Sequence, residues 1–387
     1  MGESMRAPRV LLVTRNFPPL QGGMERLNWH LADELGRHCE LRVIAPLGAA
    51  AHAPAGVVVR EVALQPLSSF LVKVTLRARQ EASRWRPQFV LAGSGLTAPA
   101  AWWAARACRA RAMAYVHGLD LTVPHPVYRA LWNPVLRRLH GVIANSNATA
   151  ALAQRIGIEP ARIGIVHPGT DLPTADAQAR ARFRKVHAIG SDAPLLLSVG
   201  RLTDRKGLRE FVAEVLPDIV RCRPDVVLAV VGDAPRHALY ARPQSLQSIL
   251  QAAQAAGTAA NVRLLGRLDE VSLHDAYFAA DVHVFPIREL PDDPEGFGMV
   301  AVEAAAHGLA SVAYACGGVV DAVADGVSGR LVAAGDSAAF AVTVLELLAR
   351  RLPAADIRGF AEGFSWERFG ARVRDGLREA GPSHGRP

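Results

Sequence analysis

Hydrophobic and polar positions alternate in two distinct rhythms along the first half of the chain. Short aliphatic runs, typical of buried strands, occur at residues 9–14, 41–45, 57–62, 88–92, 111–116 and 141–144. Between most of them lie longer segments whose apolar residues recur at helical spacing. Strands and helices that alternate in this way form right-handed βαβ units, so the pattern predicts a parallel sheet with helices on both faces.

The same rhythm returns after a polar stretch that contains Pro173, which places a hinge between about Gly169 and Gly190. Further strands are predicted at residues 194–199, 226–231, 262–265, 282–285 and 309–313. We therefore expect an α/β protein with two Rossmann-like parallel-sheet domains, residues 1–172 and 190–364, that face each other across a cleft. Residues 365–387 are predicted to form a helix, which packs back toward the N-terminal domain, and a polar tail.

Composition supports a globular protein with two cores. The chain has 387 residues, of which 50% are hydrophobic and 21% charged, an ordinary balance for globular domains. Its four cysteines lie far apart without a C-x-x-C pair, so neither a zinc site nor a disulfide framework is indicated. No signal segment is recognised, and no apolar run reaches the roughly 18 residues of a spanning helix. We expect a soluble or peripheral protein in a reducing cytosol.

The formal net charge of +8 and a pI near 9.8 predict an anionic partner. Nucleic acid, an anionic membrane surface and a phosphorylated substrate would all satisfy this charge. The sequence has no zinc finger, RNP motif or arginine-rich arm, which makes nucleic acid the least favoured of the three.

Two glutamates separated by seven residues, Glu295 and Glu303, are the most informative chemical feature. Glu295 follows a predicted strand at 280–285, and open α/β sheets bind ligands at the carboxyl ends of their strands. Glycines at 296 and 298 let the backbone approach a ligand, and a helix that begins near Gly298 directs free amides at an anion or a sugar oxygen. The alternative is a surface glutamate and a helical glutamate with no joint role.

A second basic feature follows the strand predicted at 194–199. Arg201 and Lys206 lie five residues apart in one loop, where a guanidinium and an ammonium can converge on a diphosphate. A leaving nucleoside diphosphate needs such charge compensation. A solvated basic turn is the alternative interpretation.

The N-terminal half offers weaker candidates. Gly22 and Gly23 precede a helix that begins near Met24, a position suited to phosphate or sugar contact through backbone amides. His117 directly follows the strand at 111–116 and is therefore expected at the cleft, although a single histidine is more often structural. Residues 93–98 formally match a dinucleotide fingerprint, but a tight strand-to-helix turn explains them equally well, because no acidic residue follows at the required distance.

Two amphipathic segments suggest a surface role. Within residues 67–86 one helical face carries Leu67, Leu71, Val74, Ala78, Ala82 and Trp85, and another carries Lys73, Arg77 and Arg84. A second stripe consists of Tyr128, Leu131, Trp132, Val135 and Leu139. Each segment is either a basic helix that lies on a membrane surface or an ordinary helix that faces the core.

Taken together, these motifs resemble glycosyltransferase family 4, the retaining GT-B enzymes that move a sugar from a nucleotide diphosphate. The resemblance covers nearly the whole chain and depends on Gly22, Gly23, His117, Gly118, Arg201, Lys206, Glu295 and Glu303. It implies that Arg201 and Lys206 neutralise the diphosphate and that Glu303 holds the ribose hydroxyls. Gly266 would lie at the edge that binds the base.

The resemblance also implies contacts around the transferred sugar. Glu295 would face that sugar, and His117 would contact it near the reacting carbon. Gly22 and Gly23 would leave room for phosphate and acceptor. The backbone expected to touch the sugar hydroxyls belongs to Gly296, Phe297, Gly298, Met299 and Val300.

The implied activity is transfer of a hexose-type sugar, with retention, to an acceptor hydroxyl of a lipid-linked, lipopolysaccharide or exopolysaccharide intermediate. No cofactor or metal ion is expected, because the chain has no Asp-x-Asp motif. Expected partners are a nucleotide-sugar donor, a lipid-linked or saccharide acceptor and an anionic membrane, without nucleic acid. The enzyme would be cytoplasmic and peripheral on the inner face of the membrane. A GT-B nucleotide-sugar epimerase and a non-catalytic nucleotide-sugar-binding protein remain alternatives.

Overall fold

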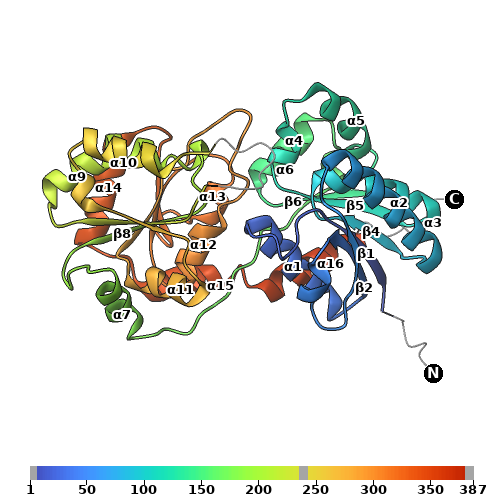
Figure 1. Cartoon of the computed structure of the whole chain (residues 1–387), viewed down its shortest axis with the longest axis horizontal. Coiled ribbons are helices and arrows are strands. Elements are labelled where there is room, and N and C mark those ends of the chain that lie inside the picture. The colour runs from blue at the N-terminus through green and yellow to red at the C-terminus, as the bar shows by residue number, and fades with distance from the viewer. Residues whose placement is uncertain (1–6, 235–242, 380–387) are drawn as a thin grey trace. The chain divides into compact units, whose positions relative to one another are not determined.

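The computed structural model describes residues 7–234 and 243–379, which form two compact units (Figure 1). Unit 1 comprises Met1–Gly169 together with Trp366–Pro387, and unit 2 comprises Thr170–Ser365. Residues 170–189, which the sequence pattern placed outside the second domain, belong to unit 2, where α7 packs against α11. Of the helix and polar tail predicted at 365–387, residues 380–387 lie outside the described residues.

The sheet of unit 1 is parallel, with the strand order β3-β2-β1-β4-β5-β6-β7 within the described residues. The predicted strands are all present, and the sequence analysis missed β7, which has three residues and lies at the sheet edge. The strands are β1 (Arg9–Val13), β2 (Glu40–Pro46), β3 (Val58–Val62), β4 (Phe89–Ala92), β5 (Arg111–Val116), β6 (Gly141–Ala144) and β7 (Ile163–Ile165).

Helices cover both faces of this sheet (Figure 1). On one face α2 packs against α3 and α3 packs against α5, while α1 packs beside α16. The helices are α1 (Gly23–Gly36), α2 (Leu67–Trp85), α3 (Ala98–Cys108), α4 (Leu119–Thr122), α5 (Pro126–Leu136), α6 (Asn147–Arg155) and α16 (Trp366–Glu379). Short 3-10 turns occur at Ala49–His52, Gly95–Thr97 and Pro160–Arg162.

The apolar face that the sequence analysis considered for membrane contact in α2 is buried in the core of unit 1. Val74, Ala78 and Ala82 are fully buried, and Trp85 is 9% exposed. This stripe packs with Leu11 of β1 and Val90 of β4. The expectation that this face meets a membrane is therefore wrong. The helix is amphipathic because it covers the sheet.

Unit 2 repeats the architecture with the parallel strand order β10-β9-β8-β11-β12-β13 in the part of the chain that is described. The strands are β8 (Leu195–Val199), β9 (Val227–Val231), β10 (Val262–Gly266), β11 (Val282–Phe285), β12 (Ser311–Tyr314) and β13 (Gly329–Val332). The strand β13, which has four residues and lies at the edge of the sheet, was not predicted from the sequence.

The helices of unit 2 cover both faces of its sheet (Figure 1). They are α7 (Ala179–Val186), α8 (Leu208–Glu210), α9 (Leu216–Cys222), α10 (Leu246–Ala255), α11 (Glu270–Ala279), α12 (Met299–Ala306), α13 (Val319–Ala322), α14 (Ser337–Ala349) and α15 (Ala354–Glu362). A π-helical segment, Phe211–Val215, connects α8 to α9, and 3-10 turns occur at Asp204–Lys206 and Ala259–Asn261.

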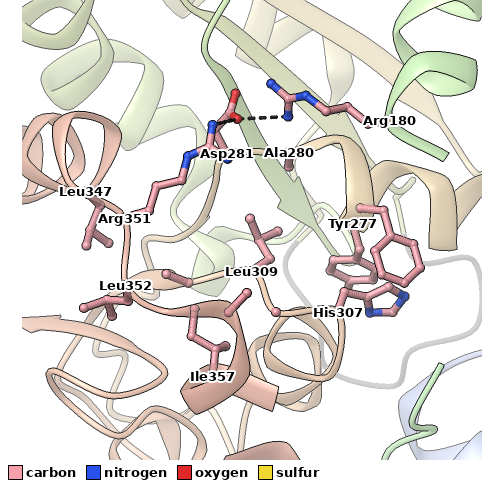
Figure 2. A pocket seen from close by; sticks show the side chains of 14 residues that line it. Arg180, Tyr277, Ala280, Asp281, His307, Leu309, Leu347, Arg351, Leu352 and Ile357 are labelled. Carbon is pink, nitrogen blue, oxygen red and sulfur yellow. Dashed lines mark hydrogen bonds and ion pairs between the residues drawn. The ribbon is translucent and has the colours of Figure 1, made fainter. Parts of the chain in front are cut away.

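A buried carboxylate ties α7 to the amino ends of the strands of unit 2 (Figure 2). Asp281 is 7% exposed and accepts bonds from Arg180 at 2.9 Å and Arg184 at 3.0 Å. The amide of Leu195, the first residue of β8, donates to the same carboxylate at 2.8 Å. Arg351 also binds it. Several partners for one buried charge offset the cost of removing it from water.

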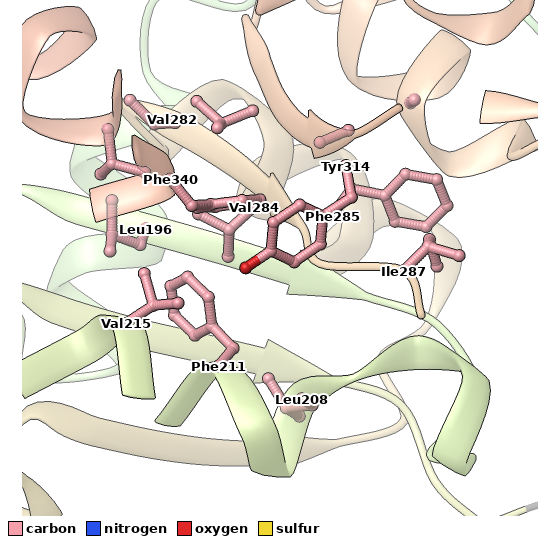
Figure 3. Close-up of a cluster of buried hydrophobic side chains, with 14 of the residues drawn as sticks. Leu196, Leu208, Phe211, Val215, Val282, Val284, Phe285, Ile287, Tyr314 and Phe340 are labelled. Carbon is pink, nitrogen blue, oxygen red and sulfur yellow. The ribbon is translucent and has the colours of Figure 1, made fainter. Parts of the chain in front are cut away.

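The apolar core of unit 2 lies between its sheet and the helices on one face (Figure 3). Phe211 and Phe340 meet edge to face, with centroids 5.7 Å apart and an interplanar angle of 74°. Tyr314 of β12 lies 4.8 Å from Phe340. Such aromatic pairs fix ring orientation in addition to burying apolar area, so this core holds β11 and β12 in a defined position beneath the loops that follow them.

The C-terminal helix α16 belongs to the core of unit 1. Phe369 is 2% exposed and packs against Tyr115 at 6.0 Å and Trp366 at 5.6 Å. Trp366 stacks on His30 of α1 at 3.8 Å. No helix within the described residues is both long and apolar enough to cross a membrane.

We expect Phe369→Ala to destabilise unit 1 by about 3 kcal/mol, because it leaves a cavity among well-packed rings. All six tryptophans of the chain lie in unit 1, so urea unfolding followed by tryptophan fluorescence measures this unit specifically. The control is Arg372→Ala, which truncates an exposed side chain of the same helix. Equal unfolding midpoints for the two variants would contradict the packing role of α16.

Candidate active site

Strand order reverses in both sheets, between β1 and β4 in unit 1 and between β8 and β11 in unit 2. At such a reversal, the loops that follow the two central strands run to opposite sides and leave a crevice at the carboxyl edge. In unit 2, the loops after β8 and β11 contain the predicted site residues Lys206 and Glu295. The topology therefore accounts for their proximity.

Lys206 and Glu295 form a buried ion pair, with Nζ 2.9 Å from Oε2. Their side chains are 16% and 10% exposed. The ammonium also lies 4.7 Å from the centre of the Phe285 ring, at the end of β11. These contacts fix the position of the lysine at the crevice, because both partners are themselves held by the fold.

Arg205 is a third member of this charge cluster that the sequence analysis missed. Its Nε lies 3.1 Å from Glu295, and its guanidinium also binds Asp293. The sequence offers one signal for this residue, which is that it directly precedes Lys206. Position in the sequence does not tell whether a side chain faces the crevice or the solvent. In the structure Arg205 makes Glu295 a carboxylate shared by two cations.

The cluster is charged at neutral pH. Burial opposes ionisation of Glu295, but Lys206 and Arg205 outweigh it and lower the pKa of the carboxyl to about 2. Burial lowers the pKa of the Lys206 ammonium, and the attraction of Glu295 partly restores it. Burial, together with the charge of Lys206, lowers the pKa of His283 to about 3. A neutral imidazole therefore lies close to Lys206.

Gly298 is required where the loop meets α12. Its φ of 101° lies in the left-handed region, and a Cβ there would lie 2.8 Å from Phe285 Cε1. The residue precedes α12 without any side-chain cap. The first amides of the helix, including those of Met299 and Val300, are thus available to an anion or a sugar oxygen.

Glycines hold this loop against the loop that follows β12. Gly318 donates its amide to the carbonyl of Glu295 at 2.8 Å. A Cβ on Gly318 would lie 2.1 Å from the carbonyl oxygen of Gly296. The side chain of Phe297 is buried, at 2% exposure, so only its backbone is available to a ligand. Gly318 was not among the site residues predicted from the sequence.

Glu303 lies within α12, and its carboxylate is bound by an aromatic side chain that is itself packed against a histidine. The hydroxyl of Tyr277 donates to Glu303 Oε2 at 3.0 Å, and Tyr277 stacks on His307 at 4.8 Å. Both rings line a cavity of about 180 Å³ in unit 2 (Figure 2). His274 contacts His307 at 2.8 Å. Tyr277 is thus a positioning residue for Glu303 that the sequence analysis missed.

The remaining predicted residues of unit 2, Arg201 and Gly266, are more accessible to solvent. Arg201 is exposed at the start of the loop after β8. Gly266 ends β10 with a φ of 64°, and no atom lies within 4 Å of the position that its Cβ would take. Both positions are accessible to a ligand at the carboxyl edge of the sheet.

The predicted residues of unit 1 lie at the carboxyl edge of its own sheet. Gly22 precedes α1, and a Cβ there would lie 2.4 Å from Glu25 Oε2; Gly23 is the first residue of that helix. His117 follows β5, and its Nε2 lies 3.0 Å from the carbonyl oxygen of Gly93. Residues 93–97 form the turn that enters α3, as the alternative interpretation of the dinucleotide-like motif expects.

Comparison with known proteins identifies the class of the fold. Anabaena HepE in complex with UDP superposes with a TM-score of 0.76 at 20% identity, over 95% of this chain and 99% of that one. Two units with parallel sheets and this structural similarity define a GT-B fold. Within the described residues, no cluster of three or more potential metal-binding side chains occurs.

Sequence comparison then identifies the family. The profile of Glycosyltransferase Family 4 matches residues 21–173, and that of Glycosyl transferases group 1 matches residues 193–350. The GDP-mannose-dependent alpha-(1-6)-phosphatidylinositol monomannoside mannosyltransferase of Mycolicibacterium smegmatis is 30% identical over 393 residues, which cover 96% of this chain and 99% of the relative. The chain belongs to glycosyltransferase family 4.

A D-inositol 3-phosphate glycosyltransferase from Geodermatophilus obscurus is 37% identical over 251 residues, or 63% of this chain. This chain spans about half of that relative, since the match covers 54% of it. The predicted family and fold class are confirmed by these comparisons.

We expect Glu295→Gln to destabilise unit 2 by roughly 3 kcal/mol at pH 7, because two buried cations lose their shared carboxylate. The pKa of Glu295, about 2 in the folded protein against an ordinary 4.5, means that this stability is present above pH 4.5. It is lost as the pH falls toward 2, where wild type and variant should converge.

Urea unfolding followed by circular dichroism at pH 7 and pH 3 measures this difference. Tryptophan fluorescence serves as the internal control, since it reports only unit 1. Glu289→Gln, which neutralises an exposed carboxylate of the same loop, should behave like wild type. A destabilisation by Glu295→Gln that is equal at both pH values would refute the ion-pair account.

Proposed function

We propose that the protein transfers a hexose-type sugar from a nucleotide-diphosphate sugar to an acceptor hydroxyl, with retention of anomeric configuration. The observation that carries this proposal is the buried cluster of Lys206, Arg205 and Glu295, next to the uncapped start of α12. Cations and helix amides at one edge suit the charge that develops on a leaving diphosphate.

Each donor group has a candidate partner in unit 2. Lys206, with Arg201 and the first amides of α12, would bind the diphosphate, and Glu303 would bind the ribose hydroxyls. Glu295 would keep Lys206 charged and accept a hydroxyl of the transferred sugar. The open position at Gly266 would admit the base. In unit 1, Gly22, Gly23 and His117 would border the sugar and the acceptor.

In the proposed reaction, the bond between the anomeric carbon and the phosphate oxygen breaks as the acceptor oxygen bonds to that carbon on the same face. The acceptor proton passes to the departing phosphate oxygen, so no protein nucleophile is needed. Stabilisation of the leaving group by Lys206 and the helix amides requires no divalent metal.

The relatives suggest substrates to test first. One relative is named as GDP-mannose-dependent and acts on a phosphatidylinositol monomannoside, another is named for D-inositol 3-phosphate, and HepE binds UDP. We therefore propose mannose or another hexose as the donor sugar and a lipid-linked or saccharide acceptor. A GT-B epimerase would return an epimeric nucleotide sugar, with neither a new glycoside nor net release of nucleoside diphosphate, and a non-catalytic binding protein would leave the nucleotide sugar unchanged.

We expect Lys206→Met to lower kcat/KM for the donor by roughly 30-fold to 1,000-fold, because the leaving diphosphate loses a charge-assisted contact worth about 2–4 kcal/mol. Release of nucleoside diphosphate from a panel of nucleotide sugars, with and without lipid extract, is followed by mass spectrometry. Arg209→Met is the matched control, since it removes an exposed cation close to the same loop.

Unchanged catalytic efficiency in Lys206→Met would refute the proposed diphosphate site. The assay is repeated with excess EDTA, which should leave transfer intact. Loss of activity that magnesium or manganese restores would contradict stabilisation of the leaving group by side chains and helix amides.

We further propose that the enzyme is cytoplasmic and binds the inner face of the membrane through the outer surface of α2, α3 and α5. These three helices carry a single carboxylate, Glu81, which is buried and bound to Arg42 at 2.5 Å. Large apolar side chains are exposed beside the basic ones. They are Val72 at 60%, Leu76 at 62%, Trp103 at 49%, Val127 at 54% and Leu131 at 58% exposure.

The exposed cations of these three helices are Lys73, Arg79, Arg84, Arg106 and Arg129. A surface that combines such cations with exposed apolar side chains, and lacks exposed carboxylates, is complementary to an anionic bilayer. This surface is distinct from the buried face of α2. It would bring the enzyme to a lipid-linked acceptor.

We expect Lys73→Gln with Arg79→Gln to weaken binding to anionic vesicles by about 2 kcal/mol at low salt, since each cation contributes about 1 kcal/mol. Co-sedimentation with vesicles of phosphatidylglycerol and phosphatidylcholine measures this, and added salt should reduce it. Lys185→Gln with Arg350→Gln removes two exposed cations of unit 2 and serves as the control. Equal sedimentation of both double variants would exclude this surface as the membrane contact.

A further inference from the structure

Four neighbouring strands of unit 1, β1, β4, β5 and β6, each lead into a polar residue at the carboxyl edge of the sheet. We call these residues the polar row: Arg15, Ser94, His117 and Asn145. Three of them are buried, with exposures of 6% for Arg15, 2% for Ser94 and 5% for Asn145. The proposed function uses only His117.

The buried members of the polar row have atoms without partners. Arg15 Nε, Ser94 Oγ and Asn145 Oδ1 form no hydrogen bond with any residue in 7–234 or 243–379. Buried polar atoms are almost always satisfied in folded proteins, because each unsatisfied one costs the free energy of its lost hydration. Three such atoms along one sheet edge therefore indicate that a polar ligand supplies the missing partners.

Of the three buried residues, Arg15 has the highest free-energy cost of burial, because its side chain is charged. Its Nε has no hydrogen-bond partner within the described residues, although only 6% of the residue is exposed. Burial lowers the pKa of Arg15, and the charge of Glu25 only partly offsets that shift. Glu25 is the carboxylate whose charge acts on Arg15, but its Oε1 accepts a hydrogen bond from Asn16 Nδ2 at 2.6 Å.

The surroundings of Arg15 also favour an anion. It follows β1 at the point where the strand order reverses, and the loop continues into the start of α1, a helix of 14 residues with no side-chain cap. The amides of Gly23 and Met24 carry the positive end of the helix dipole, in the same turn as the Glu25 carboxylate. A buried guanidinium and a helix N-terminus at the same sheet edge suit a phosphate-class oxyanion.

We propose that the polar row is the acceptor site and that Arg15 binds an anionic, phosphate-class group of the acceptor, while Ser94 and Asn145 bind its hydroxyls. The inference rests on the proposed function, which it deepens by naming the acceptor as a phosphorylated or phosphodiester-linked compound. The donor diphosphate has its own cations in unit 2, Arg201 and Lys206, so Arg15 is not needed for it.

The test uses thermal unfolding of the full chain followed by tryptophan fluorescence, which reports unit 1 alone. UDP or GDP is present at saturation so that the donor site is filled, and inorganic phosphate is titrated against potassium chloride of equal ionic strength. Phosphate should raise the melting temperature of wild type, because a ligand stabilises the state that binds it. The absence of a rise beyond that in chloride would overturn the proposal.

Arg15→Met keeps the length of the side-chain stem and removes the charge. We expect it to bind phosphate about tenfold or more weakly, which abolishes the rise in melting temperature. Arg155→Met, which removes an exposed cation of the same unit, should keep the full rise. Equal stabilisation of Arg15→Met and Arg155→Met by phosphate would overturn the assignment.

The melting temperature without phosphate separates a binding residue from a structural one. Arg15→Met should unfold at the same or a higher temperature than wild type, because it removes a buried charge that lacks a partner. A lower melting temperature would mean that Arg15 supports the fold, which overturns the proposal. Failure of Arg15→Met to fold would overturn the proposal for the same reason. Arg15→Lys, which keeps a charge without the guanidinium fork, should retain a reduced but measurable rise with phosphate.

Calorimetry with UDP and GDP distinguishes the two sources of a phosphate-class anion. The dissociation constant of the nucleoside diphosphate should be the same for wild type and Arg15→Met. If the dissociation constant of the nucleoside diphosphate is tenfold higher for Arg15→Met, Arg15 binds the donor, and the proposed acceptor site is overturned. If Lys206→Met leaves that dissociation constant and turnover unchanged, the proposed function fails, whatever Arg15 does in the phosphate titration.

Discussion

One carboxylate shared by two cations organises the candidate donor site. Glu295, Lys206 and Arg205 would each be costly to bury alone, and their side chains are 10%, 16% and 12% exposed. They meet because the strand order reverses between β8 and β11, which brings the loops after these strands to one crevice. The ion pairs of Glu295 with Lys206 and Arg205 hold the loop that leads into Gly298, and the position of this loop sets where α12 begins.

The two sheets differ in how charge is compensated at the point where the strand order reverses. In unit 2 the cations at that point have a carboxylate within the protein, whereas in unit 1 Arg15 occupies the corresponding place after β1 without an ion pair among the described residues. A compensated cluster can stabilise the fold, and the exposed Arg201 in the same loop adds positive charge for a diphosphate. An uncompensated guanidinium does not stabilise the fold. The site in unit 2 is therefore preorganised by charges of the protein, whereas the site in unit 1 needs the charge of a ligand.

The sequence predicted what depends on periodicity and topology. Strands such as Arg111–Val116 and Gly141–Ala144 matched their predicted limits, because continuous aliphatic runs are typical of parallel strands buried on both faces. The meeting of Lys206 and Glu295 also follows from their loops. The strands β7 and β13 were missed because three or four residues at a sheet edge carry too little pattern. Arg205 and Arg15 were missed because the direction and burial of a side chain are properties of the tertiary structure.

The segment 67–86 also shows that a sequence pattern does not determine the surroundings of a side chain. Its strong apolar stripe was compatible with a membrane or a core, and the core accounts for it, since Val74 and Ala78 are fully buried. The informative residues were Val72 and Leu76, which lie outside that stripe and are 60% and 62% exposed. A pattern that the fold explains says nothing further about partners, whereas residues that violate it need another explanation. By this reasoning the exposed apolar side chains of α2 and the buried charge of Arg15 are features of unit 1 that folding alone does not justify.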